Sequence, residues 1–135
     1  MKNFEQRNEP SENTPLSEIE PIEEGGVAVG DRESLKFFVE APLLEACQQF
    51  FDKGIKTIFS SANKRDIEIG YAHIALDFDS LSPANKEIAL SIGKEGVIHG
   101  SVPKKGIYLE IPIDENTTLG QIKTEALALV DKFGS

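Results

Sequence analysis

The sequence predicts an α+β domain of two layers, in which three helices pack on one face of a four-stranded, mostly antiparallel sheet. Residues 71–79 alternate between apolar and polar side chains, as a strand buried on one face does. Three stretches, near residues 42–53, 82–92 and 118–133, place apolar side chains at helical spacing. With the remaining strand-like segments they give the order α-β-β-α-β-β-α, which is typical of an α+β fold.

Residues 1–26 are predicted to be a disordered acidic tail, and residues 27–135 a single α+β domain. The tail holds three of the seven prolines, many Glu, Asn and Ser residues, and one aromatic residue. Such a segment cannot bury enough apolar surface to offset the entropy that is lost on ordering. Its role is either that of a solubilising linker or that of a partner-binding arm anchored by Leu16, Ile19 and Ile22.

Residues 34–40 are ambiguous between helix and strand. Their apolar side chains alternate with polar ones, which also suits a strand. Proline is favoured at the first position of a helix, so Pro42 is compatible with a main helix that begins afresh at Ala41. We favour a helix for residues 34–40, capped by Asp31 or Ser34.

The segment from Pro42 to Arg65 is predicted to form an amphipathic helix, a strand and a polar turn in succession. Gly54 lies where a glycine commonly ends a helix, and the residues after it (IKTIFS) are rich in β-branched side chains. The apolar face of this helix carries Leu43, Leu44, Cys47, Phe50 and Phe51.

The second strand is predicted over residues 71–79 (YAHIALDFD). Alternation directs one set of side chains to the core, namely Ala72, Ile74, Leu76 and Phe78. The other set points outward and comprises Tyr71, His73, Ala75, Asp77 and Asp79. Ser82 followed by Pro83 then predicts the start of a helix that ends near residue 92.

Two further strands are predicted over residues 96–102 and 104–113, joined by a turn at Pro103–Gly106. Because the preceding helix crosses back over the sheet, the third strand should run parallel to the second, and the two hairpin turns should lie at opposite ends. Thr118 and Gln121 have the spacing of a capping box, which predicts the start of the last helix.

Composition restricts the classes of partner. The chain has 14 Lys and Arg against 23 Asp and Glu, a net charge of −9, so its average field repels phosphate backbones and anionic lipid surfaces. We therefore expect binding to neither nucleic acid nor membranes. Cys47 is the single cysteine and cannot form an intramolecular disulfide, and the N-terminus lacks the apolar stretch of a secretion signal. A cytoplasmic location is expected.

The outward face of the sheet is the first candidate site. It carries Tyr71, His73, Asp77, Tyr108 and Glu110, and also His99 if Ile98 and Val102 point inward. Two histidines and two carboxylates are donors that suit a divalent metal, but no HxH, HxxxH or HExxH spacing fixes a pair of them. We predict neither a metal nor a cofactor, because antiparallel sheets commonly leave one face polar for solvent alone. A protein partner that docks on the tyrosines and histidines is the next alternative for this face.

The turn after the first strand is the second candidate site. Its polar side chains are those of Ser60, Ser61, Asn63, Lys64 and Arg65. Ser61 and Lys64 match the S-x-x-K spacing of serine acyl-transfer enzymes, but the other elements of those enzymes are missing. Hydrogen bonding within a tight turn explains these residue types better, and a small anionic or polar ligand is a further possibility.

The leading hypothesis is a non-enzymatic interaction or regulatory domain of acidic character, which in one version occludes a basic partner as an inhibitor or antitoxin does. The alternative is a small ligand-binding domain or enzyme centred on residues 60–66, with His73 as the proton carrier. That alternative predicts a concave pocket beside Asn63 and His73. The oligomeric state does not follow from the sequence.

Overall fold

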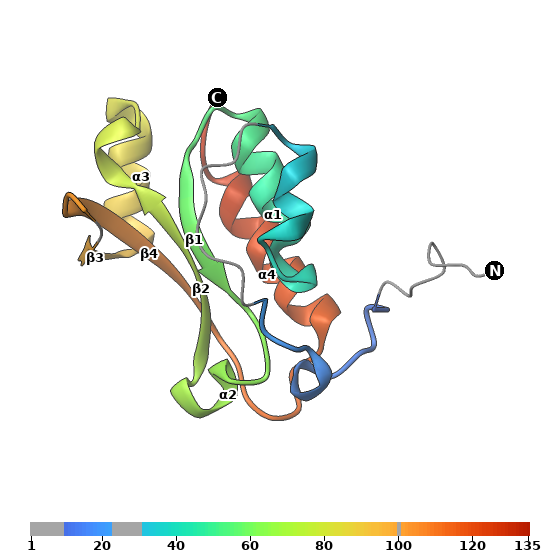
Figure 1. Cartoon of the computed structure of the whole chain (residues 1–135). Coiled ribbons are helices and arrows are strands. Elements are labelled where there is room, and N and C mark those ends of the chain that lie inside the picture. Colours follow the sequence, from blue (N-terminus) through green and yellow to red (C-terminus); the bar gives the residue numbers. More distant parts are fainter. Residues whose placement is uncertain (1–9, 23–30, 100) are drawn as a thin grey trace.

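The computed structural model describes residues 10–22, 31–99 and 101–135 (Figure 1). The predicted α+β class is confirmed, with a four-stranded antiparallel sheet in the order β1-β2-β4-β3. The strands are β1 (Thr57–Ser61), β2 (Tyr71–Asp77), β3 (Lys94–Ile98) and β4 (Lys104–Pro112). The helices are α1 (Ala41–Asp52), α2 (Asp66–Ile69), α3 (Pro83–Ile92) and α4 (Leu119–Asp131).

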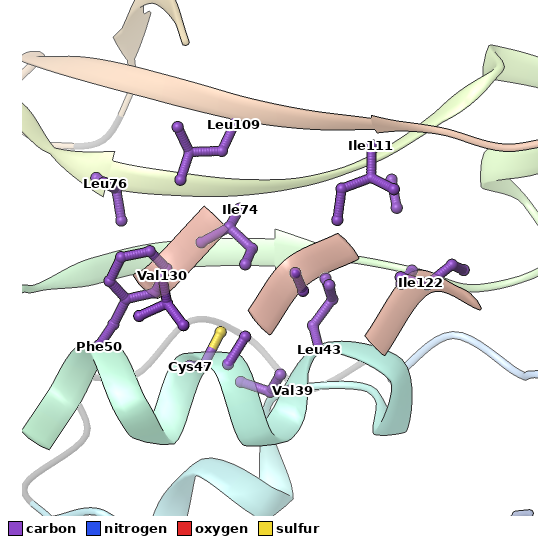
Figure 2. Close-up of a cluster of buried hydrophobic side chains, with 14 of the residues drawn as sticks. Val39, Leu43, Cys47, Phe50, Ile74, Leu76, Leu109, Ile111, Ile122 and Val130 are labelled. Atoms are coloured by element: carbon purple, nitrogen blue, oxygen red, sulfur yellow. The ribbon is translucent and has the colours of Figure 1, made fainter. Parts of the chain in front are cut away.

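The core lies between the sheet and helices α1 and α4, which run side by side along one of its faces (Figure 1). Ile74 lies opposite Leu109 and Leu76 opposite Ile107, so the central strands β2 and β4 turn their aliphatic side chains to the same side. Figure 2 shows these strands above α1 and α4, with Leu43, Cys47, Phe50, Ile122 and Val130 approaching them from the helices. The alternation predicted for β2 is confirmed.

Three helix starts follow from local sequence. Pro42 lies in the first turn of α1. Ser82 precedes α3, and its Oγ accepts a hydrogen bond from the backbone N–H of Asn85 at 3.2 Å. Thr118 and Gln121 form the predicted capping box at the start of α4. These predictions are confirmed because each depends only on neighbouring residues.

The ambiguous segment before α1 is helical in its first part only, since residues 38–40 lie outside the helix. Glu33–Phe37 form a short 3₁₀ helix, and Oδ1 of Asp31 accepts a hydrogen bond from the backbone N–H of Ser34 at 2.9 Å. The strand β2 ends at Asp77, earlier than predicted, because Phe78–Ser80 turn into another 3₁₀ helix that buries Phe78.

The hairpin of β3 and β4 differs from the prediction in the bounds of its first strand and of its turn. Strand β3 begins at Lys94, directly after α3, and the connection occupies residues 99–103. Gly106, which the sequence assigned to the turn, lies within β4 opposite Gly96. It is a glycine because the side chain of Ile98 fills the space where its Cβ would be. Strands β2 and β3 are both antiparallel to β4, so the third strand runs parallel to the second as predicted, and the two hairpin turns lie at opposite ends of the sheet.

Residues 10–22 pack against the domain, where the sequence predicted part of a disordered tail. Leu16 is fully buried and Ile19 is 6% exposed. The backbone N–H of Leu16 donates to the carbonyl of Thr117 at 2.8 Å, and Pro15 and Thr118 form an isolated β-bridge. The prediction of disorder from composition was wrong for residues 10–22, because two apolar anchors and main-chain hydrogen bonds are enough to hold this segment against the domain. The rest of the predicted tail, residues 1–9 and 23–26, lies outside the described residues.

Candidate functional site

Four aromatic side chains gather on the sheet face that is turned away from α1 and α4. Phe59 of β1, Tyr71 and His73 of β2, and Tyr108 of β4 are called here the aromatic cluster. Cross-strand register places them on one face, since Phe59 and Tyr108 both lie opposite Ala75. The register thus places the side chains of Tyr71, His73 and Tyr108 on the outward face, as predicted.

His73 is the centre of the aromatic cluster. Its ring centroid lies 5.6 Å from that of Phe59, 5.8 Å from that of Tyr108 and 6.2 Å from that of Tyr71. The contacts with Phe59 and Tyr71 are edge-to-face, an arrangement that aromatic quadrupoles favour. Ala75, which lies between Phe59 and Tyr108 in the sheet, is fully buried, while Phe59 itself remains 41% exposed. The aromatic cluster is therefore a preformed surface with an apolar floor.

Tyr108 is held over the edge strand by a close approach to Gly96. A Cβ atom on Gly96 would lie 2.8 Å from Cε1 of Tyr108, closer than real Cβ contacts come. Glycine at this position therefore lets the tyrosine ring lie flat across β3. Phe59 completes the arrangement from the other side, with its ring centroid 5.8 Å from that of Tyr108.

Charges beside the aromatic cluster are paired. Lys94 Nζ lies 3.1 Å from Oε1 of Glu110, and Lys104 Nζ lies 3.1 Å from Oδ2 of Asp77. Asp77, a predicted site residue, is only 6% exposed and is engaged in this ion pair. The surroundings of the aromatic cluster are therefore close to neutral, although the whole chain carries a net charge of −9.

Burial lowers the pKa of His73 below its usual value of 6.5. The charges of Asp66, Glu110 and Glu40 act in the opposite direction but do not cancel the loss of hydration. His73 is therefore neutral near pH 7, and its neutral ring suits packing among aromatic neighbours.

His99 does not join the aromatic cluster. It is exposed and follows the last residue of β3. The condition that Ile98 point to the core is not met, because Ile98 lies over Gly106, which shares a face with Asp77. Within the described part of the chain, no three His, Cys, Asp or Glu side chains are grouped so that they could hold a metal ion.

Ser61 and Asn63 belong to a buried polar network built around Asp66. Oδ2 of Asp66 accepts hydrogen bonds from Oγ of Ser61 at 2.7 Å and from the backbone N–H of Asn63 at 2.9 Å. The predicted turn thus continues into the short helix α2, which begins at Asp66. Asn63 and Asp66 are 4% and 3% exposed, so the network is part of the interior.

Glu40 is the residue that sequence reasoning missed. It is 6% exposed and lies directly before α1. Its Oε1 accepts a hydrogen bond from the backbone N–H of Ala62 at 2.8 Å, and its Oε2 accepts from Nδ2 of Asn63 at 3.1 Å and from the backbone N–H of Ile22 at 2.8 Å. Nothing near Glu40 in the sequence indicates this role, because its partners come from two other parts of the chain.

The geometry does not support serine catalysis at Ser61. Its hydroxyl donates to Asp66, whereas Lys64 Nζ extends to the surface and pairs with Oε2 of Glu20 at 3.0 Å. The backbone N–H of Arg65 donates to Oδ1 of Asn63 at 2.9 Å, as expected for a tight turn. The loop residues therefore bond mainly to one another.

Ser60 points to the opposite side from Ser61. It pairs with Ile74, and its side chain hydrogen-bonds the thiol of Cys47. Burial raises the pKa of that thiol to about 12. Cys47 is thus an interior residue that a ligand does not reach, whereas Ser60 is partly exposed and turns its side chain to the core.

Two surface hollows are present, and neither is lined by Asn63 or His73. One of about 330 Å³ is lined by residues 10–22 together with Glu40 and Ala41. Another of about 480 Å³ lies at the β3–β4 hairpin, beside Val97 and Pro103. Neither is the concave pocket that the ligand-binding alternative predicted.

No helix among the described residues is long and apolar enough to cross a membrane. Comparisons with protein-family models, with curated proteins and with solved structures gave no match.

Proposed function

We propose that this chain is a non-catalytic protein-interaction domain and that the aromatic cluster is its contact surface. One observation carries the proposal: Phe59, Tyr71 and Tyr108 surround His73 on the face that α1 and α4 leave uncovered. Aromatic side chains contribute large contact areas and lose little side-chain entropy when they are buried by a partner. Their packing against one another means that the surface exists before the partner arrives.

The charge distribution suggests that the association rate and the binding affinity depend on different parts of the domain. The ion pairs Lys94–Glu110 and Lys104–Asp77 leave the surroundings of the aromatic cluster nearly neutral. Burial of the rings then supplies most of the affinity, while the net charge of −9 steers a basic partner towards the domain. Added salt should slow association more than it speeds dissociation.

The alternative, a ligand-binding or catalytic loop at residues 60–66, has weaker support. Ser61, Asn63 and Asp66 hydrogen-bond one another, and Glu40 takes up two more donors of the loop. Such a satisfied network stabilises a fold and leaves few groups to bind a ligand.

A cytoplasmic location belongs to this proposal. Its support is Cys47, the single cysteine, which is buried and packs as an apolar residue. Such a domain requires no oxidising compartment.

The proposal is tested by capture of partners with immobilised protein followed by quantitative mass spectrometry. The variant is the double substitution Phe59→Ala and Tyr108→Ala. The matched control is Phe37→Ala, because Phe37 is also an exposed aromatic residue but lies in the 3₁₀ helix before α1. We expect a set of proteins that the wild type and the control retain and the double variant loses. Equal recovery on all three proteins would refute the aromatic cluster as the contact surface.

A further inference from the structure

Residues 10–22, called here the strap, lie across three separate parts of the domain. The strap contacts the start of α4, the loop between β1 and α2, and Glu40 before α1. In Figure 1 it is the blue segment beside the lower ends of α1 and α4. It adds no strand to the sheet and is bound to a surface that other elements form.

Main-chain hydrogen bonds hold the strap at the start of α4. The backbone N–H of Leu119 donates to the carbonyl of Thr14, and that of Gly120 donates to the carbonyl of Glu12, both at 2.9 Å. The first amides of a helix have no partner within the helix, so carbonyl groups of another segment can satisfy them. In return, the backbone N–H of Leu16 donates to the carbonyl of Thr117. Such contacts are made by the backbone and do not depend on the side chains of the bound segment.

Two side chains provide the apolar part of the contact. Leu16 is fully buried and Ile19, three residues later, is 6% exposed, while Ser17 and Glu18 between them are exposed. The carbonyl of Ile19 also accepts a hydrogen bond from the backbone N–H of Lys64 at 2.9 Å. Leu16–Glu18 form a short 3₁₀ helix, which brings Leu16 and Ile19 to the same side of the strap, so the domain binds a Leu-x-x-Ile pattern.

Opposite charges flank these anchors. Lys123 Nζ lies 3.4 Å from Oε2 of Glu12, and Lys64 Nζ lies 3.0 Å from Oε2 of Glu20. The neighbouring Glu45 and Glu12 raise the pKa of Lys123, so its positive charge is secure at neutral pH. A lysine side chain thus lies at each end of the site and forms an ion pair with a glutamate of the bound segment.

A surface hollow of about 330 Å³ borders the strap, lined on one side by Ile19 and Ile22 and on the other by Glu40 and Ala41. Leu16 and Ile19 themselves pack into the hydrophobic core, so the free space lies beside the anchors and not beneath them.

We propose that the groove under the strap is a peptide-recognition site that this chain occupies with its own residues 10–22, and that a partner protein competes for it with a segment of the form Leu-x-x-Ile flanked by acidic residues. Main-chain hydrogen bonds, two apolar anchors and a charge at each end are features by which domains recognise short peptide segments. The apparent affinity for the partner is then the intrinsic affinity multiplied by the fraction of molecules in which the strap has left the site. This site is distinct from the aromatic cluster.

The test uses the full-length chain and a fluorescent peptide with the sequence of residues 10–22. Leu16→Asp with Ile19→Asp in the chain releases the strap, and Ser17→Asp is the control because it adds a charge at an exposed position of the strap. We expect the released variant to bind the peptide at least about tenfold more tightly than the wild type or the control, because an occupied site reduces apparent affinity by its free fraction. A peptide carrying the same two Asp substitutions should not bind.

Two results would overturn the proposal. One is a released variant that keeps its native circular dichroism but binds no peptide. The other is a wild-type dimer that the peptide converts into monomers, because the natural occupant would then be the strap of a second copy. If the released variant does not fold, amide hydrogen exchange of the wild type decides the matter. Leu16, Leu119 and Gly120 should exchange faster than Ile74 of β2, and equal protection would make the strap an inseparable part of the fold.

Discussion

The carboxylate of Glu40 accepts a hydrogen bond from the side-chain amide of Asn63 at 3.1 Å, and both side chains are buried. The same carboxylate binds the backbone N–H groups of Ala62 and Ile22. Glu40 thereby joins the start of α1, the end of β1 and the strap at one point. A buried carboxylate is tolerated here because donors reach both of its oxygens.

Removal of the Glu40 carboxylate should destabilise the domain. Glu40→Ala removes the acceptor of three donors, of which the backbone N–H of Ala62 and the side-chain amide of Asn63 are buried, and we expect it to lower the free energy of unfolding by about 3 kcal/mol. Glu40→Gln keeps one acceptor oxygen and should have a smaller effect. Urea denaturation followed by circular dichroism measures both values.

Glu45→Ala is the matched control for the Glu40 variants. Glu45 is on the same helix, half exposed, and pairs with Lys123 at 3.2 Å. Surface ion pairs contribute little, so its loss should change the free energy of unfolding by about 0.5 kcal/mol or less. A loss for Glu40→Ala no greater than that for Glu45→Ala would contradict the assigned role of Glu40.

Stability should depend on the protonation of His73. Its pKa in the folded state is lowered by burial, whereas in the unfolded chain it has its usual value of 6.5. The unfolded state therefore binds the proton more readily, so the histidine destabilises the fold as the pH falls through 6.5 towards the folded-state pKa. Thermal unfolding between pH 7.5 and 5 should show a greater loss for the wild type than for His73→Gln. Parallel curves for the two proteins would show that His73 is not desolvated in the aromatic cluster.

Cys47 should be unreactive in the folded protein. Burial raises the pKa of its thiol to about 12, so the nucleophilic thiolate is almost absent at pH 8. A thiol-specific reagent at pH 8 should label the native chain slowly and the chain in concentrated urea rapidly. Rapid labelling of the native chain would show that the interface of α1 with the sheet opens readily.

The two faces of β2 and its neighbours should differ in their sensitivity to truncation. Ile74 is fully buried in the core, and Ile74→Ala should lower the free energy of unfolding by about 3 kcal/mol. Phe59 on the opposite face is 41% exposed, and Phe59→Ala should cost about 1 kcal/mol. Denaturation midpoints of the two variants compare these losses directly. The reverse order would mean that the sides of the sheet have been assigned incorrectly.

Features set by neighbouring residues could be predicted from the sequence. The alternation of β2 gave both its buried and its outward side chains, and the caps at Ser82 and Thr118 gave two helix starts. Gly106 misled the prediction because a glycine inside a strand has the same local signature as one in a turn. Only the packing of Ile98, from another strand, distinguishes the two.

Features set by distant residues could not be predicted. Glu40 and Asp66 appear in the sequence as ordinary surface acids, and their burial depends on donors brought to them by folding. Leu16 and Ile19 were recognised as anchors for a partner, but their binding site lies within the same chain. Phe59 was not expected at the aromatic cluster because the face to which it points is set by the pairing of β1 with β2, where Phe59 lies opposite Ala75.

The central claim is that the aromatic cluster binds a protein partner, and calorimetric titration of a purified partner against three forms of the chain tests it most directly. Two aromatic contact residues together contribute several kcal/mol, so Phe59→Ala with Tyr108→Ala should weaken binding by about 100-fold or more, while Phe37→Ala should leave it unchanged. Equal dissociation constants for the wild type and the double variant would contradict the claim.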